Sequence, residues 1–147
     1  MTDEYECLKL ENQLCFPLYA CSKEIVRRYR PFLDELDLTY TQYITMMALW
    51  EYGPSSVNDL GSKLYLDSGT LTPLLKNLES KGYICKERSK KDERTVVVSL
   101  TQKGKELRDR AAEIPGKMAG CIALEPEKAK QLYSLLYEVL NGCPIKN

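Results

Sequence analysis

The segment Asp67–Lys103 constrains the fold of this chain more than any other. Its first part repeats leucine at helical spacing and keeps small or polar residues between the leucines, which predicts a helix with one apolar face. Asp67 or Ser68 suits the N-cap of this helix, and Gly82 suits its end because a glycine accepts a left-handed backbone. Two β-rich runs, Tyr83–Arg88 and Thr95–Leu100, lie on either side of a charged turn and predict a hairpin, followed by the start of another helix.

Two shorter helices are predicted before this segment. Residues 40–52 are dense in apolar side chains, and residues 57–64 follow the capping serines Ser55 and Ser56. Only three residues separate the second of these helices from the leucine-repeat helix. Helix, tight connection, helix and hairpin is the order of a winged helix-turn-helix, which places one helix in the DNA major groove and the hairpin over the phosphates or the minor groove. An ordinary amphipathic helix followed by a solvated hairpin would not explain the short helix upstream.

The distribution of charge along the chain is consistent with DNA binding by one local segment. The 147 residues carry 21 basic and 21 acidic side chains, so the formal net charge is zero. Residues 86–94 hold five basic residues against three acids, a local charge of +2. A modest patch of this kind favours a protein that reads the sequence of double-stranded DNA over a nonspecific condenser of DNA.

Composition excludes several other classes of protein. The chain has no histidine, which removes histidine-dependent nucleophilic catalysis and the commonest zinc ligand. Its six cysteines form no C-x-x-C pair, so neither a metal nor a cofactor is expected. No run of 18 apolar residues exists, and the acidic first 11 residues do not resemble a secretory signal. The expectation is a cytoplasmic protein with no membrane partner.

The helices outside the winged helix-turn-helix predict a dimer. We expect one domain over residues 1–147, mainly α with a small β-hairpin wing, and with a winged helix-turn-helix at about 40–101. The first flanking segment, about 8–31, is predicted to be a long helix that Pro31 and the acidic stretch at 34–37 break. The second, about 102–142, is interrupted by Pro115 and Gly116. Both segments are more apolar than that core could cover. A second copy of the chain is the simplest partner that could bury these apolar segments. We therefore predict a homodimer that binds a near-palindromic DNA site.

One cysteine stands out within the first predicted helix. Cys15 could be a small apolar filler, since free cysteines are often buried. Pro17, however, would delete the hydrogen bond to the Gln13 carbonyl and open the turn around Cys15. Tyr19 lies one helical turn away and could donate a hydrogen bond to a thiolate. Both interpretations, packing residue and reactive thiol, stay open on the residues alone.

With these motifs in view, the chain resembles the MarR family of winged-helix regulators, specifically the OhrR-type sensors of organic hydroperoxides. The resemblance runs over nearly the whole chain. Two positions depart from the family pattern: Asn77 stands where relatives often have a basic residue, and Pro17 replaces an ordinary helix former. The segments that carry the resemblance most specifically are Leu10–Phe16, Leu38–Tyr43, Tyr65–Lys76, Asp92–Arg94 and Ser99–Thr101.

The resemblance implies a redox-sensing regulator and assigns its residues. Cys15 would be the peroxidatic sensor, supported by Tyr29 and Tyr40 across the dimer with Tyr19 nearby, and its oxidation would release DNA. Arg94 would enter the minor groove, with Asp67 or Asp92 fixing it. The remaining DNA contacts are assigned to the recognition helix and the basic hairpin: Ser68, Thr70, Thr72, Lys76, Arg88 and Lys90.

The fate of the oxidised sensor stays open. In one mechanism Cys121 of the other subunit resolves the oxidised Cys15 as a disulfide, and in another a small thiol caps it. A third possibility is a regulator released by a phenolic or lipophilic ligand, with Cys15 incidental. A thiol peroxidase is disfavoured, because a recognition helix and a wing would have no purpose in it, so the chain is predicted not to be an enzyme.

Overall fold

The computed structural model describes residues 4–142, and the chain divides into two compact units, residues 1–40 and 41–147. The first unit contains two short 3₁₀ turns, Glu6–Leu8 and Leu10–Asn12, and the long helix α1, Cys15–Asp34. Leu38 donates its backbone N–H to the Leu33 carbonyl (3.1 Å), and Asp37 adopts a left-handed conformation with φ 53°. The acidic stretch after α1 therefore ends the helix, as the sequence predicted.

The predicted start of the first helix at about residue 8 is wrong, because the helix begins at Cys15. Side-chain amides hold the preceding segment in turns: Gln13 Nε2 donates to the Cys7 carbonyl (2.6 Å), and Asn12 Nδ2 to the Glu6 carbonyl (2.8 Å). Such local bonds compete with helical ones. The prediction that the helix ends at Pro31 is also wrong, since this exposed proline lies inside α1.

The later start of α1 changes the role of Pro17. Pro17 is the third residue of the helix, and backbone N–H groups in a first turn have no acceptor within the helix. A proline is tolerated there because it removes no intrahelical hydrogen bond. The predicted opening of the turn around Cys15 is therefore wrong. Cys15 is instead the first residue of a regular helix.

The second unit opens with the three predicted helices, α2 (Tyr40–Tyr52), α3 (Val57–Leu64) and α4 (Ser68–Ser80). The predicted caps are confirmed: Ser56 Oγ accepts from the Asp59 N–H (3.0 Å), and an Asp67 carboxylate oxygen accepts from the Thr70 N–H (2.7 Å). Tyr65 closes α3 in a left-handed conformation, φ 55°, which makes the connection to α4 tight. At the other end of α4, Gly82 has φ 81°, as expected for a residue that ends a helix.

The leucine repeat of α4 forms the centre of the core. Its exposed positions carry the polar residues, so the helix is amphipathic as predicted. Helices α2 and α3 and the strands bury side chains together with this repeat, and two helices that follow the strands bury further ones. The core includes Leu71, Leu74, Leu75, Leu78, Met46, Leu49, Leu60, Ile84, Val98, Leu107 and Ile114.

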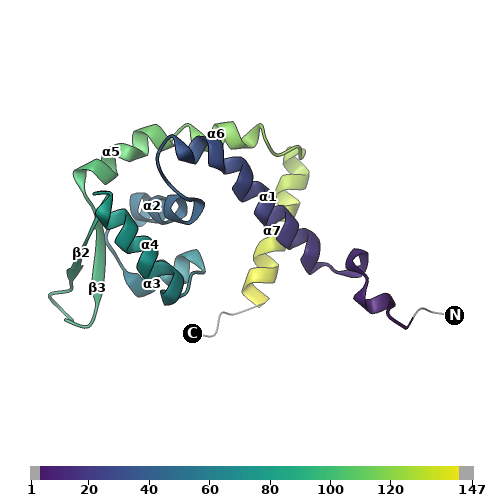
Figure 1. Ribbon diagram of the computed structural model, residues 1–147, viewed down its shortest axis with the longest axis horizontal. Coiled ribbons are helices and arrows are strands. Elements are labelled where there is room, and N and C mark those ends of the chain that lie inside the picture. Colours follow the sequence, from purple (N-terminus) through teal and green to yellow (C-terminus); the bar gives the residue numbers. More distant parts are fainter. Residues whose placement is uncertain (1–3, 143–147) are drawn as a thin grey trace. The chain divides into compact units, whose positions relative to one another are not determined.

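The hairpin is part of a three-stranded antiparallel sheet. Strands β2 (Ile84–Arg88) and β3 (Val96–Leu100) pair with Ile84 opposite Leu100 and Arg88 opposite Val96. A two-residue strand, β1 (Ser55–Ser56), pairs with the other edge of β3, giving the order β1-β3-β2. The sequence did not predict β1, because two serines carry no strand pattern. Figure 1 shows the β2–β3 hairpin beside α4.

Three helices complete the second unit: α5 (Gln102–Ala111), α6 (Ile114–Ala119) and α7 (Pro126–Gly142). Thr101 caps α5 by accepting from the Gly104 N–H (3.1 Å). Gly104 must be a glycine, since a Cβ there would lie 2.1 Å from the Tyr83 carbonyl oxygen. Pro115 lies in the first turn of α6, so it helps to begin a helix after the predicted interruption.

The sequence prediction of a mainly α fold with a β-hairpin wing is confirmed by this arrangement. None of the helices found between residues 4 and 142 is both long and apolar enough to cross a membrane.

Candidate functional site

The exposed face of α4 carries the residues predicted to read DNA. Ser68, Thr70, Thr72 and Lys76 are all exposed. The backbone N–H of Thr70, and after it the Thr70 side chain, hydrogen-bond the Asp67 carboxylate and hold the pKa of Asp67 below its ordinary value. The first turn of α4 is therefore fixed by an ionised cap, which leaves the following polar side chains on a rigid helix.

The charged turn of the wing is held by its own side chains. Asp92 Oδ1 accepts from the backbone N–H of Arg94 (3.0 Å), and the Ser89 N–H donates to the Thr95 carbonyl (2.8 Å). Arg88 Nη1 donates to the Glu93 carbonyl (3.1 Å), so this guanidinium braces the turn. Asp92 thus fixes the backbone that carries Arg94.

Asp67 has a different place from the one expected of a wing-orienting acid. Its carboxylate is used in the cap of α4, and among residues 4–142 it forms no ion pair with Arg94. Within the described residues, only Asp92 of the two acids acts on the wing.

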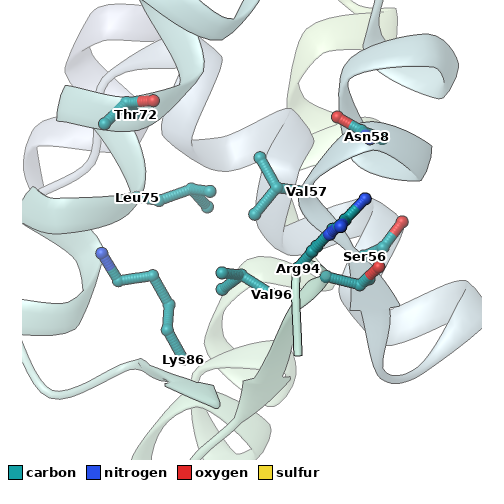
Figure 2. A pocket seen from close by; sticks show the side chains of 9 residues that line it. Ser56, Val57, Asn58, Thr72, Leu75, Lys86, Arg94 and Val96 are labelled. Atoms are coloured by element: carbon teal, nitrogen blue, oxygen red, sulfur yellow. The ribbon is translucent and has the colours of Figure 1, made fainter. Parts of the chain in front are cut away.

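A groove of about 270 Å³ lies between α4, the start of α3 and the wing. Figure 2 shows Lys86 on the α4 side of this groove and Arg94 on the α3 side, with apolar side chains between them. Two cations with nearby hydroxyl and amide groups suit a bound anionic group. The residues that line the groove are Ser56, Val57, Asn58, Thr72, Leu75, Lys86, Arg94, Thr95 and Val96.

The structure brings some of the predicted residues together and leaves others apart. Thr72 and Arg94 share the groove, whereas Ser68, Thr70 and Lys76 lie on the exposed face of α4 outside it. Arg88 and Lys90 belong to the exposed hairpin and do not line the groove either.

Sequence reasoning missed a connection between the wing and the end of α4. The Lys86 backbone N–H donates to Glu79 Oε2 (3.2 Å), and Lys86 Nζ lies 3.8 Å from Glu79 Oε1. Strand β2 is an edge strand, so this carboxylate satisfies a donor that the sheet leaves unpaired. No sequence motif signals the pair, although the sequence does place a basic residue at the start of the hairpin.

The first unit carries the predicted sensor cysteine. Cys15 is exposed and has a free thiol. The rings of Tyr29 and Tyr40 lie 5.0 Å apart between centroids, and burial raises the pKa of both hydroxyls, which favours their protonated, hydrogen-bond-donating form. Tyr19 is 60% exposed, with Lys23 Nζ 5.2 Å from its ring centroid. Within the described part of one subunit, no hydrogen bond joins Cys15 to a tyrosine.

The predicted resolving cysteine lies after α6. Cys121 is half-buried, and its Sγ donates to the Lys117 carbonyl (3.5 Å). Cys7, Cys21 and Cys85 are free thiols. Cys143 falls outside the described residues. Between residues 4 and 142 no group of histidine, cysteine and acidic side chains gathers in a way that could hold a metal ion.

Comparison with known proteins places this geometry in a family. A family model described as transcriptional regulator SarA/Rot matches residues 27–111. The organic hydroperoxide resistance transcriptional regulator of Bacillus subtilis is 47% identical over 147 residues, which cover 100% of both chains. The HTH-type transcriptional regulator SarZ of Staphylococcus aureus is 43% identical over 127 residues, 86% of each chain.

Solved structures agree with these relatives. Reduced AbfR bound to DNA matches with a TM-score of 0.78 and 33% identity, covering 95% of this chain and 98% of that chain. A structure of disulfide-formed AbfR matches with a TM-score of 0.66 at 33% identity, over 93% of this chain and 96% of that one. AbfR comes from Staphylococcus epidermidis.

These relatives are transcriptional regulators and not enzymes, in agreement with the prediction from the sequence. The winged helix-turn-helix, the exposed face of α4 and the full-length match to a hydroperoxide regulator lead to the same assignment. The chain belongs to the MarR family of winged-helix transcriptional regulators, in the branch of the organic hydroperoxide regulators.

Proposed function

We propose that the protein is a homodimeric, cytoplasmic repressor that releases its operator DNA when an organic hydroperoxide oxidises Cys15. The observation that carries the proposal is the full-length 47% identity with an organic hydroperoxide resistance regulator, in a chain whose Cys15 thiol is exposed. Release of the operator on oxidation would turn on transcription of the genes that the protein represses.

The homodimer is supported by α7. All of its residues are exposed in one subunit, including the large apolar side chains of Tyr133 (64% exposed) and Leu135 (57%). Monomeric proteins rarely expose a continuous apolar surface of this kind. A second copy of the chain would cover it and would present two α4 helices to successive major grooves of a near-palindromic operator.

DNA binding is supported by the polar face of α4 and by the basic wing. In this proposal the exposed α4 residues contact base edges, while Lys86 and Arg94 face phosphates or the minor groove from the wing side. The structure of reduced AbfR bound to DNA supports this assignment, because the two chains match over 95% of this one.

The sensing chemistry would use the Cys15 thiolate as the nucleophile. Cys15 is the first residue of α1, where unpaired backbone N–H groups favour negative charge. The sulfur attacks an oxygen of the hydroperoxide and the O–O bond breaks. With one proton taken from solvent, the products are a cysteine sulfenic acid and an alcohol. We propose that protonated Tyr29 and Tyr40 donate hydrogen bonds to the thiolate across the dimer, with Tyr19 nearby, since none does so within one described subunit.

Cys121 is proposed to resolve the sulfenic acid. Its thiol would attack the sulfur of Cys15 in the other subunit, giving a disulfide and one water molecule. The disulfide-formed structure of AbfR, which this chain matches over 93% of its length, supports this step. A disulfide needs Cα atoms within about 7 Å, so its formation would shift the helices that carry the two winged units.

Mass spectrometry of the oxidised protein tests this function together with its mechanism. We expect a Cys15–Cys121 crosslinked dimer, formed over the same range of hydroperoxide that releases operator DNA. A mixed disulfide between Cys15 and a small thiol would replace the two-cysteine mechanism with the one-cysteine alternative. An unmodified Cys15 in protein that has released its DNA would refute thiol sensing.

A further inference from the structure

We propose that Gln42 is a positioning residue that couples the start of α2 to the end of the recognition helix α4. Gln42 Nε2 donates to Asn77 Oδ1 (2.8 Å), and Gln42 Oε1 accepts from Lys81 Nζ (3.3 Å). Asn77 lies in the last turn of α4, and Lys81 is the C-cap of that helix. Both ends of one amide are therefore bound to the same end of α4, an arrangement that we call the Gln42 clamp.

The burial of Gln42 makes this clamp exceptional. Gln42 is only 6% exposed, and the described residues contain just two other buried polar side chains, Thr45 and Ser55. Thr45 donates to the Thr41 carbonyl of its own helix, and Ser55 to the Gly53 carbonyl two residues earlier. Gln42 is thus the one among these three with hydrogen bonds to another helix. Breaking a buried hydrogen bond is costly, so α2 and the end of α4 should move together.

The clamp also explains the unusual residue at position 77. Lysine and arginine side chains are donors without an acceptor atom, whereas the Asn77 amide supplies the oxygen that Gln42 needs. A basic residue, which the family resemblance implies for many relatives at this position, could not accept this bond. Asn77 is therefore explained as a partner of α2 and not as a weakened phosphate contact.

The position of Gln42 connects the clamp to sensing. Gln42 is the third residue of α2, and Tyr40 is the first, so both lie in one helical turn. In the proposed function, on which this inference rests, Tyr40 supports the Cys15 thiolate. Oxidation that displaces Tyr40 would move the first turn of α2, and the Gln42 clamp would pass that movement to the DNA-reading helix.

The test compares operator binding before and after oxidation in the full-length dimer. Gln42→Met keeps the length of the side chain but cannot donate to Asn77, and Asn77→Ala removes the same bond at an exposed position, where it creates no cavity in the core. Thr45→Val is the matched control, a buried polar residue of α2 whose bond stays within its own helix. Each protein is treated with the same hydroperoxide, and oxidation of Cys15 is measured by mass spectrometry in the same samples.

We expect Cys15 to be oxidised in Gln42→Met and Asn77→Ala as it is in the parent protein. The ratio of the Kd for DNA after oxidation to the Kd before it should be at least about fivefold smaller in both variants than in the parent protein. The double variant should lose no more of this ratio than Gln42→Met alone, because Gln42→Met already removes the bond to Asn77. Thr45→Val should keep the parent ratio. If the clamp had a purely structural role, the two clamp variants would have a lower melting temperature but the same ratio as the parent protein. The ratio would also stay unchanged if Asn77 simply bound DNA, equally in the reduced and the oxidised protein.

Parent-like ratios in both clamp variants would overturn the proposal. If Gln42→Met fails to fold, Asn77→Ala decides alone. Failure of the proposed function gives a different result, which is seen in the parent protein itself. The parent protein would then stay bound to DNA although Cys15 is oxidised, or its Cys15 would not be oxidised at all.

Discussion

Replacement of Arg94 by alanine should change the salt dependence of operator binding by a predictable amount. Arg94 is exposed on the wing, lines the groove beside α4, and has its backbone fixed by Asp92. A homodimer carries two copies, and each phosphate neutralised contributes about 0.9 to the slope of log K against log salt. Loss of both should reduce the slope by about 1.8. Between about 50 and 200 mM salt, the advantage of the parent protein over Arg94→Ala should fall by about 12-fold.

The assay is a fluorescence anisotropy titration of one operator duplex at a series of salt concentrations. Lys117→Ala is the control, because it removes one cation per subunit from α6, outside the winged helix-turn-helix, where Lys117 pairs with Glu113 (3.5 Å). The control should keep the parent slope. Equal slopes for the parent protein and Arg94→Ala would show that Arg94 releases no counterions and that the wing lies off the DNA.

Three further predictions concern folding, pH and the fate of the sensor. Gly104→Ala should destabilise the protein by about 2–4 kcal/mol in urea unfolding, because the new Cβ would lie 2.1 Å from the Tyr83 carbonyl; an unchanged midpoint would contradict this close approach. The pKa of Asp67 is lower in the folded protein, so its ionised cap stabilises the fold above the ordinary pKa of 3.8, and this stabilisation is lost as the pH falls through the lower folded value. Asp67→Asn should remove this part of the pH dependence of the free energy of unfolding. An unaltered pH dependence in Asp67→Asn would count against the ionised cap. Cys121→Ser should accumulate more sulfinic acid at Cys15 by mass spectrometry, whereas a yield equal to that of the parent protein would exclude Cys121 as the resolving thiol.

The sequence predicted the winged helix-turn-helix well because its signals are local. Ser56 and Asp67 cap the helices that follow them, and the leucine repeat of α4 allows one buried face. The hairpin strands lie within one residue of their predicted limits. Each of these features depends on residues at most a few positions apart, which a pattern can reveal.

The features that the sequence did not reveal depend on contacts between distant residues or on competing side chains. The late start of α1 follows from amide groups of Asn12 and Gln13 that bind the preceding backbone. Strand β1 exists only because β3, which lies far along the chain, pairs with it. The hydrogen bond between Gln42 and Asn77 joins residues 35 positions apart, so no local sequence motif could predict it.

The central claim is that oxidation of Cys15 releases the operator, and one titration tests it most directly. Operator binding by the parent protein and by Cys15→Ser is measured against increasing tert-butyl hydroperoxide, and a thiol reductant is added at the end. The account predicts that the parent protein loses its DNA and recovers it on reduction, while Cys15→Ser stays bound at every dose. Release of Cys15→Ser at the same dose as the parent protein would contradict the account.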